Sequence, residues 1–72
     1  MRKADITKLQ VQDIVQLIRQ WSEETQMEFS KSVNKSYSSI TKIETGERNL
    51  YLHTFIAWCK KKGINIILIK KD

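Results

Sequence analysis

The chain has 72 residues, two of them glycine and none proline, and its 13 lysine and arginine residues against 8 acidic residues give a formal charge of +5. A chain of this length builds one small core, which usually needs a disulfide, a metal ion or oligomerisation for stability. Its single cysteine and single histidine exclude an intrachain disulfide and a four-ligand zinc site, which leaves oligomerisation, while the positive charge favours a polyanionic partner.

Residues 1–10 are basic at their start but lead into no long apolar run. A signal peptide or a membrane span would need such a run, so we expect a cytoplasmic protein that does not bind membranes. Thr7 and Gln10 have the spacing of a capping box, which would give this segment an extra helical turn. An extended arm fits the same residues equally well.

The first helix is predicted from Val11. Apolar residues recur at Val11, Ile14, Val15 and Ile18, which is the spacing of one helix face and not of a strand. We expect this helix to end near residues 23–24.

A second, short helix follows Thr25. Thr25 and Glu28 form a capping-box pair, and Phe29 and Val33 give the helix one apolar stripe over about two turns. Asn34 then tolerates the left-handed conformation that ends a helix, so a tight turn is expected there.

The third helix is predicted over Tyr37–Thr45. Ser36 is a favourable N-cap, Ile40 and Ile43 form one apolar edge, and Gly46 stands where a left-handed residue ends a helix. Most other positions in this helix are polar, so one broad face should be exposed.

A fourth helix and a strand complete the expected elements. The helix runs from about Leu52 to Gly63, because Leu52, Phe55, Ile56 and Cys59 repeat the helical spacing. Residues 64–70 are rich in β-branched side chains and are predicted to form a strand. Since every other element is helical, this strand would need a partner from a second chain.

Two short helices joined by a tight turn within residues 25–46 indicate either a helix-turn-helix or an ordinary helical hairpin. Several residues in and around this segment also follow a known pattern: Arg19, Gln26, Ser36, Ile40, Ile43, Glu44 and Gly46. In these residues the chain resembles the Cro and phage-repressor (Xre) helix-turn-helix family. The resemblance extends from about Val11 to Ile64 and is most specific at SYSSITKIETG, residues 36–46.

The resemblance implies a fold class and a set of partners. The fold is a mainly α, four- to five-helix lambda-repressor-like domain over residues 1–72, with one C-terminal strand paired across a homodimer. That strand is typical of a subset of the family that includes several antitoxins. The dimer interface is expected to contain Phe55, Trp58, Ile64, Ile66, Ile67, Leu68 and Ile69, with Trp58 belonging either to it or to the core.

The resemblance also implies an ion pair between Arg19 and Glu44 that fixes the third helix against the first. A bidentate arginine–carboxylate pair fixes orientation more than it adds stability. Two unrelated surface charges are the alternative interpretation.

The expected DNA contacts fall into two sets. The base-contacting residues are Tyr37, Ser38, Thr41 and Lys42 on the exposed face of the third helix. The backbone contacts are Gln26, Lys35, Ser36, Ser39, Arg48 and Asn49, although Arg48 and Asn49 could equally be solvated loop residues.

Three positions depart from the family pattern. Glu23 and Glu24 stand where the family commonly has a glycine and an apolar residue, and Lys35 replaces an apolar residue in the turn. The junction between the first and second helices therefore needs a local explanation in this chain.

These features favour a sequence-specific transcriptional regulator, a repressor that binds double-stranded DNA as a homodimer. The alternative is an antitoxin or antirepressor whose main partner is a toxin or another regulatory protein. No phosphate-binding glycine loop, metal-ligand set or catalytic triad spacing is present, so neither an enzyme nor a cofactor is expected.

Overall fold

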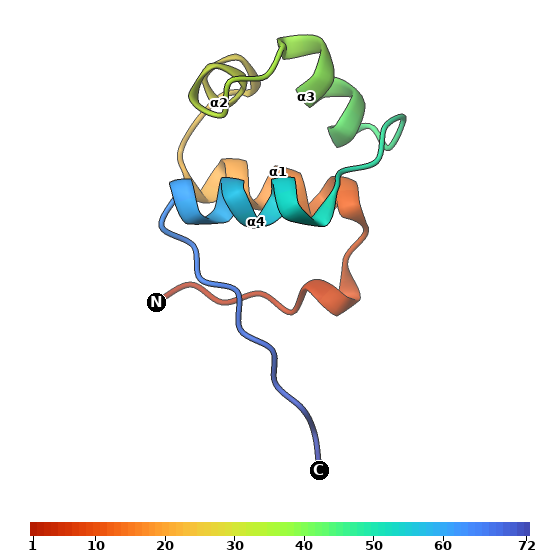
Figure 1. Ribbon diagram of the computed structural model, residues 1–72, viewed down its shortest axis with the longest axis vertical. Coiled ribbons are helices and arrows are strands. Elements are labelled where there is room, and N and C mark those ends of the chain that lie inside the picture. The colour runs from red at the N-terminus through yellow and green to blue at the C-terminus, as the bar shows by residue number, and fades with distance from the viewer.

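The computed structural model describes all 72 residues. It contains four α-helices, which are preceded by one 3₁₀ turn (Figure 1). The helices are α1 (Val11–Trp21), α2 (Gln26–Ser32), α3 (Tyr37–Glu44) and α4 (Leu52–Lys61), and the 3₁₀ turn is Ile6–Lys8. All four helices were predicted from the sequence, and their predicted first residues agree with the structure, whereas their C-terminal ends lie one to three residues earlier than predicted. No helix is long and apolar enough to cross a membrane.

The helices form two layers along the long axis of the molecule. In Figure 1, α2 and α3 occupy one end, α1 and α4 the middle, and the N-terminal arm and the C-terminal tail the other end. We use "tail" for residues 64–72. The tail therefore projects away from α3.

The core takes at least one buried side chain from every helix. Its members are Val15, Ile18, Phe29, Val33, Ile40, Ile43, Trp58 and Cys59. The rings of Phe29 and Trp58 meet edge to face with centroids 5.4 Å apart, which is a favoured aromatic geometry. Burial also raises the pKa of the Cys59 thiol, because the thiolate would lose its hydration.

The turns between helices follow their predicted chemistry. Asn34 has φ of 58° and Gly46 has φ of 85°, so both adopt the left-handed conformation predicted after α2 and α3, and Gly63 adopts it after α4 with φ of 70°. At Gly46 a side chain would also lie 3.3 Å from the Gln12 amide. The chain is thus redirected after each of these three helices.

The expected capping box of Thr7 and Gln10 does not form. Asp5 caps the 3₁₀ turn instead, because its carboxylate accepts hydrogen bonds from both the backbone N–H and the hydroxyl of Thr7. The side-chain oxygen of Gln10 accepts from Gln12 and caps no helix. Residues 1–10 combine an arm with one short turn.

The predicted C-terminal strand is absent, so this part of the expected fold class was wrong. Residues 64–72 form neither a helix nor a strand, and the structure contains no sheet. A strand is stabilised by hydrogen bonds to a neighbouring strand, and here every other element is helical. High β propensity at residues 64–69 did not produce a strand without such a neighbour.

Glu23 adopts a conformation that suits glycine better. It has φ of 56° just after α1, and its exposed side chain forms no hydrogen bond or ion pair. We expect Glu23→Gly to stabilise the fold by about 0.5–1 kcal/mol, because relief of the left-handed strain exceeds the extra entropy of glycine in the unfolded chain. A thermal melt should show a midpoint higher by several degrees, because in a domain of this size about 1 kcal/mol of stability shifts the midpoint by roughly that amount.

Asn34→Gly is the matched control for this substitution. Asn34 has nearly the same φ, but asparagine tolerates that region better than glutamate. It should therefore gain less stability than Glu23→Gly. Equal gains at the two positions would contradict the strain argument.

Candidate nucleic-acid interface

One face of α3 is buried and the other is open. Ile40 and Ile43 lie in the core, whereas Tyr37, Ser38 and Lys42 are exposed. Tyr37 keeps 46% of its surface accessible. The fourth expected base-contacting residue, Thr41, is half-buried, and its hydroxyl donates to the Ser38 carbonyl at 2.9 Å. The structure thus places all four side chains outside the core, on one short helix.

An ion pair joins the C-terminal end of α3 to α1. Arg19 Nε donates to Glu44 Oε2 at 2.8 Å, and Nη2 donates to Oε1 at 3.0 Å. The Glu44 side chain is only 2% exposed and the Arg19 side chain 18%. Two parallel hydrogen bonds in a water-poor site define the angle between the helices, which a single flexible contact would not do.

Two glutamines complete the surroundings of Glu44. Gln26, in the first turn of α2, donates from Nε2 to Glu44 Oε1 at 3.2 Å. Gln16, on α1, donates from Nε2 to the Glu44 backbone carbonyl at 3.0 Å. The end of α3 is therefore held from both α1 and α2.

Gln16 was not identified from the sequence. It lies three residues before Arg19, and residues three apart share one helix face. That spacing could have indicated that both side chains reach α3.

A second hydrogen-bonded group lies at the N-terminal end of α3. The Ser36 hydroxyl caps the helix by accepting from the Ser39 N–H at 3.1 Å, and it donates to Ser39 Oγ at 2.8 Å. Arg48, from the loop after α3, donates to the same Ser39 Oγ at 3.0 Å. These contacts hold the loop against the first turn of α3, with Arg48 itself exposed.

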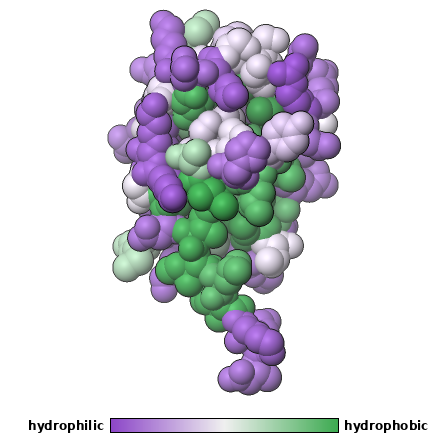
Figure 2. All heavy atoms as spheres, viewed as in Figure 1, coloured by the Kyte–Doolittle hydropathy of each residue, from purple (hydrophilic) through white to green (hydrophobic).

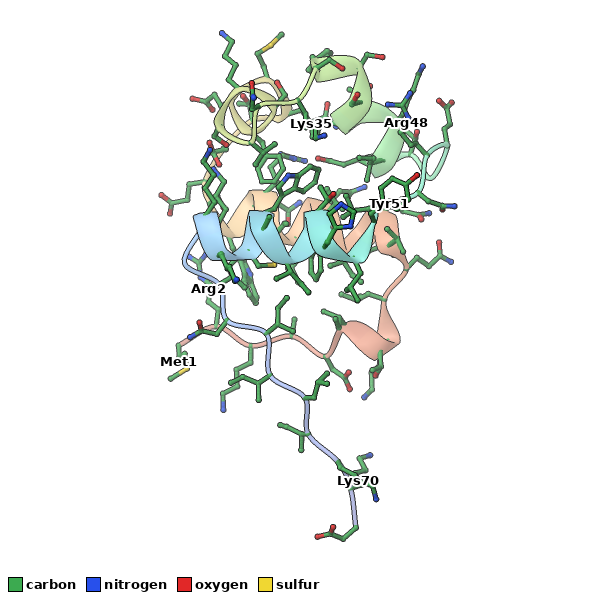
Figure 3. The ribbon with its side chains drawn as sticks, viewed as in Figure 1. Met1, Arg2, Lys35, Arg48, Tyr51 and Lys70 are labelled. Carbon is green, nitrogen blue, oxygen red and sulfur yellow. The ribbon has the colours of Figure 1, made fainter.

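The remaining backbone candidates, Lys35 and Asn49, are exposed in the loops on either side of α3. Figure 3 shows Lys35 and Arg48 at the end of the molecule formed by α2 and α3. The structure therefore presents positively charged side chains at the same end as the polar face of α3.

The start of α2 is fixed by the predicted capping box. Thr25 Oγ1 accepts from the Glu28 N–H at 3.1 Å, and Glu28 Oε1 accepts from the Thr25 N–H at 2.9 Å. The Thr25 backbone hydrogen bond, followed by the contact with its side chain, lowers the pKa of Glu28. Because the folded-state pKa is lowered, this contribution to stability is present above about pH 4.5 and is lost as the pH falls.

Comparison with solved structures finds other chains with the same fold. A chain in a HipA–HipB–O2–O3 complex matches with a TM-score of 0.62 and 21% identity, covering 100% of this chain and 99% of that one. A chain of an MDT Protein gives the same values. A chain in a HipB–O1–O2 complex matches with a TM-score of 0.61 and 21% identity, over 97% of this chain and 99% of that one.

This chain shares its fold with them. The match extends over nearly the full length of each chain, so it includes α1 to α4 and not the α2–α3 pair alone. No family model matches the sequence, and no curated protein matches it.

The expected dimer residues fall into three groups. Trp58 is 4% exposed and belongs to the core. Phe55 and Ile64 are partly buried against that core, and the apolar tail residues are exposed: Ile66, Ile67, Leu68 and Ile69. Figure 2 shows apolar surface that extends from the middle of the molecule into the tail.

This apolar surface borders a groove. The groove has a volume of about 640 Å³ and lies between the N-terminal arm, α1, the end of α4 and the tail. Soluble monomers rarely leave large continuous apolar surface uncovered. The surface lies toward the end of the molecule opposite α3.

Proposed function

We propose that this protein is a sequence-specific transcriptional regulator, a repressor that binds double-stranded DNA through the exposed face of α3. The observation that carries the proposal is the geometry of α3, which presents a polar face while Arg19 and Glu44 fix its angle. A helix-turn-helix protein places such a helix in the major groove. A regulator of this kind would act in the cytoplasm of a bacterial or phage-infected cell.

The base contacts are assigned to four side chains. Lys42 donates to guanine O6 or N7, and Ser38 and Thr41 are short enough to reach base edges. The Tyr37 ring contacts a thymine methyl group or places its hydroxyl on a phosphate.

The backbone contacts are assigned to residues on both sides of α3. Gln26 binds a phosphate from the first turn of α2. Its amide has two N–H donors, so it can keep its bond to Glu44 while it binds the phosphate. The other members are Lys35, Ser36, Ser39, Arg48 and Asn49, of which Ser36, Ser39 and Arg48 are already connected by hydrogen bonds.

We propose a homodimer formed by the apolar surface opposite α3. The interface contains Phe55, Ile64, Ile66, Ile67, Leu68 and Ile69, which leaves Trp58 to the core. It uses side-chain contacts and requires no strand. A two-fold dimer would place two copies of α3 on a palindromic site, with half-sites about 34 Å apart.

Selection of bound sites from random duplexes tests the DNA-binding proposal. We expect an enriched palindromic sequence and an affinity that falls steeply with salt, because lysine and arginine contacts release counterions from the phosphates. Binding that is equally strong for every duplex would contradict sequence-specific recognition.

Two substitutions test the division of roles on the selected site. Lys42→Ala should reduce discrimination at one or two base positions by about 1–3 kcal/mol. Gln26→Ala should weaken binding to all duplexes about equally. Lys60→Ala, on α4, removes the same charge as Lys42→Ala and is the matched control. Identical changes of sequence preference in the Lys42 and Gln26 variants would contradict these assignments.

A second candidate function is that of an antitoxin or antirepressor with a protein partner. One chain of the same fold occurs in an assembly that contains HipA and HipB. Co-expression with a growth-arresting protein encoded beside this chain tests the idea. Relief of growth arrest supports a protein partner, and its absence together with specific duplex binding favours the regulator alone.

A further inference from the structure

One lysine at the end of α4 contacts three separate parts of the α2 region. Lys62 Nζ lies 2.5 Å from Glu24 Oε1 and 2.6 Å from Ser32 Oγ, and 5.3 Å from the centre of the Phe29 ring. The Lys62 side chain is 11% exposed and that of Glu24 20%. An ammonium group is seldom shielded from water to this degree unless it is paired, so the position of Lys62 indicates a structural role for its contacts.

Glu24 connects this lysine to the network around α3. Its backbone carbonyl accepts a hydrogen bond from Arg19 Nη1 at 3.1 Å, and Arg19 holds Glu44. Its side-chain Oε1 is shielded from solvent and has no hydrogen-bond partner, so the ion pair with Lys62 is its only polar contact. Glu24 is also one of the departures from the family pattern, where an apolar residue is common. In this chain a partly buried ion pair occupies that position.

The contacts of Lys62 lie at both ends of α2. Glu24 immediately precedes Thr25, the N-cap of α2, and Ser32 is its last residue. A helix of seven residues has little stability of its own, so tertiary contacts fix its position. Lys62 thus joins the beginning and the end of this short helix to α4.

We infer that Lys62 and Glu24 are positioning residues for DNA binding, which hold α2 at the angle that places Gln26 on both Glu44 and a phosphate. The inference rests on the proposed DNA-binding function. Neither residue has to contact DNA. The pair acts by holding α2 in place. It also acts on the end of α3, because Arg19 binds both the Glu24 carbonyl and the Glu44 carboxylate.

Charge and positioning predict different signs for two neutralising substitutions. Lys62→Met removes a positive charge and Glu24→Gln removes a negative one. If only the long-range electrostatic attraction between the protein and DNA mattered, Lys62→Met would weaken binding and Glu24→Gln would strengthen it. If the pair positions α2, both should weaken binding, by about 2- to 30-fold.

The affinity for the selected duplex is measured at a temperature at which circular dichroism shows every variant to be folded. Lys61→Met and Glu23→Gln are the matched controls, because each makes the same charge change one residue away on an exposed side chain. The exchanged pair, Glu24→Lys with Lys62→Glu, restores the ion pair but not the contact of the ammonium with the Phe29 ring, so it should recover part of the affinity. Opposite signs for the two single variants, or no recovery in the exchanged pair, would overturn the inference.

Amide hydrogen exchange of the free protein provides a readout that does not depend on DNA. Lys62→Met and Glu24→Gln should speed exchange in α2 relative to α1, and the exchanged pair should restore part of the protection. Unchanged protection in α2 would overturn the inference. If the unaltered protein selects no duplex, the proposed function fails, and the exchange data alone decide whether the pair holds α2.

Discussion

Replacement of Arg19 by methionine is expected to lower the free energy of unfolding by about 3–5 kcal/mol. The substitution leaves the Glu44 carboxylate, which is 2% exposed, with Gln26 as its only side-chain donor. The cost of a buried charge without its partner exceeds the net value of the pair itself. Small domains have free energies of unfolding near the lower end of the range of about 5–15 kcal/mol, so the substitution would remove most of the stability of this fold. Urea unfolding followed by circular dichroism measures the change.

Two further variants test whether the unpaired buried charge of Glu44, and not the loss of an arginine as such, causes the loss of stability. Arg2→Met removes an exposed arginine that forms no hydrogen bond or ion pair, and it should change stability by less than about 0.5 kcal/mol. A double variant with methionine at both positions 19 and 44 should regain most of the loss, because no charge remains buried. A loss below about 1 kcal/mol for Arg19→Met would mean that water reaches Glu44 and that the pair behaves as a surface contact.

The helices were predictable because their signals are local. Capping residues such as Thr25 and Ser36, and left-handed positions such as Asn34 and Gly46, act within a few residues of themselves. The apolar spacing in α1 and α4 requires only that each helix has one buried face. Each of these features is defined by the chain before any tertiary contact is known.

The tail could not be predicted in the same way. The β-branched residues at 64–69 favour an extended conformation, but a strand also needs hydrogen-bonding partners from elsewhere. Propensity is a property of the segment, whereas pairing is a property of its surroundings. The structure has no second strand, so the segment remains outside regular secondary structure.

The polar contacts around α3 likewise divide into those that could be predicted from the sequence and those that could not. The approach of Arg19 to Glu44 could be anticipated from the resemblance, which carries information about distant positions. The contacts of Gln16 with the Glu44 carbonyl and of Lys62 with Glu24 join residues 28 and 38 positions apart, and no local pattern marks them. The departure at Glu24 was visible in the sequence, but its partner was not.

Deletion of residues 65–72 is expected to convert the proposed dimer to a monomer and to lower affinity for a palindromic duplex by about 10²- to 10⁴-fold. The deletion removes four exposed apolar side chains, and burial of each at an interface would contribute about 1.5–3 kcal/mol. It leaves Ile64, which packs against the core, so the helical domain should remain folded. Sedimentation equilibrium measures the oligomeric state, and a duplex titration measures the affinity.

Deletion of residues 70–72 alone is the matched control for this experiment. Both deletions remove the same charged residues, Lys70, Lys71 and Asp72, so they alter the electrostatic attraction to DNA equally. They differ only in residues 65–69, of which four are apolar. If affinity falls in both variants by the same factor, the tail acts through its charge. If the longer deletion remains dimeric, another surface joins the two copies, and the apolar tail cannot set the distance between their α3 helices.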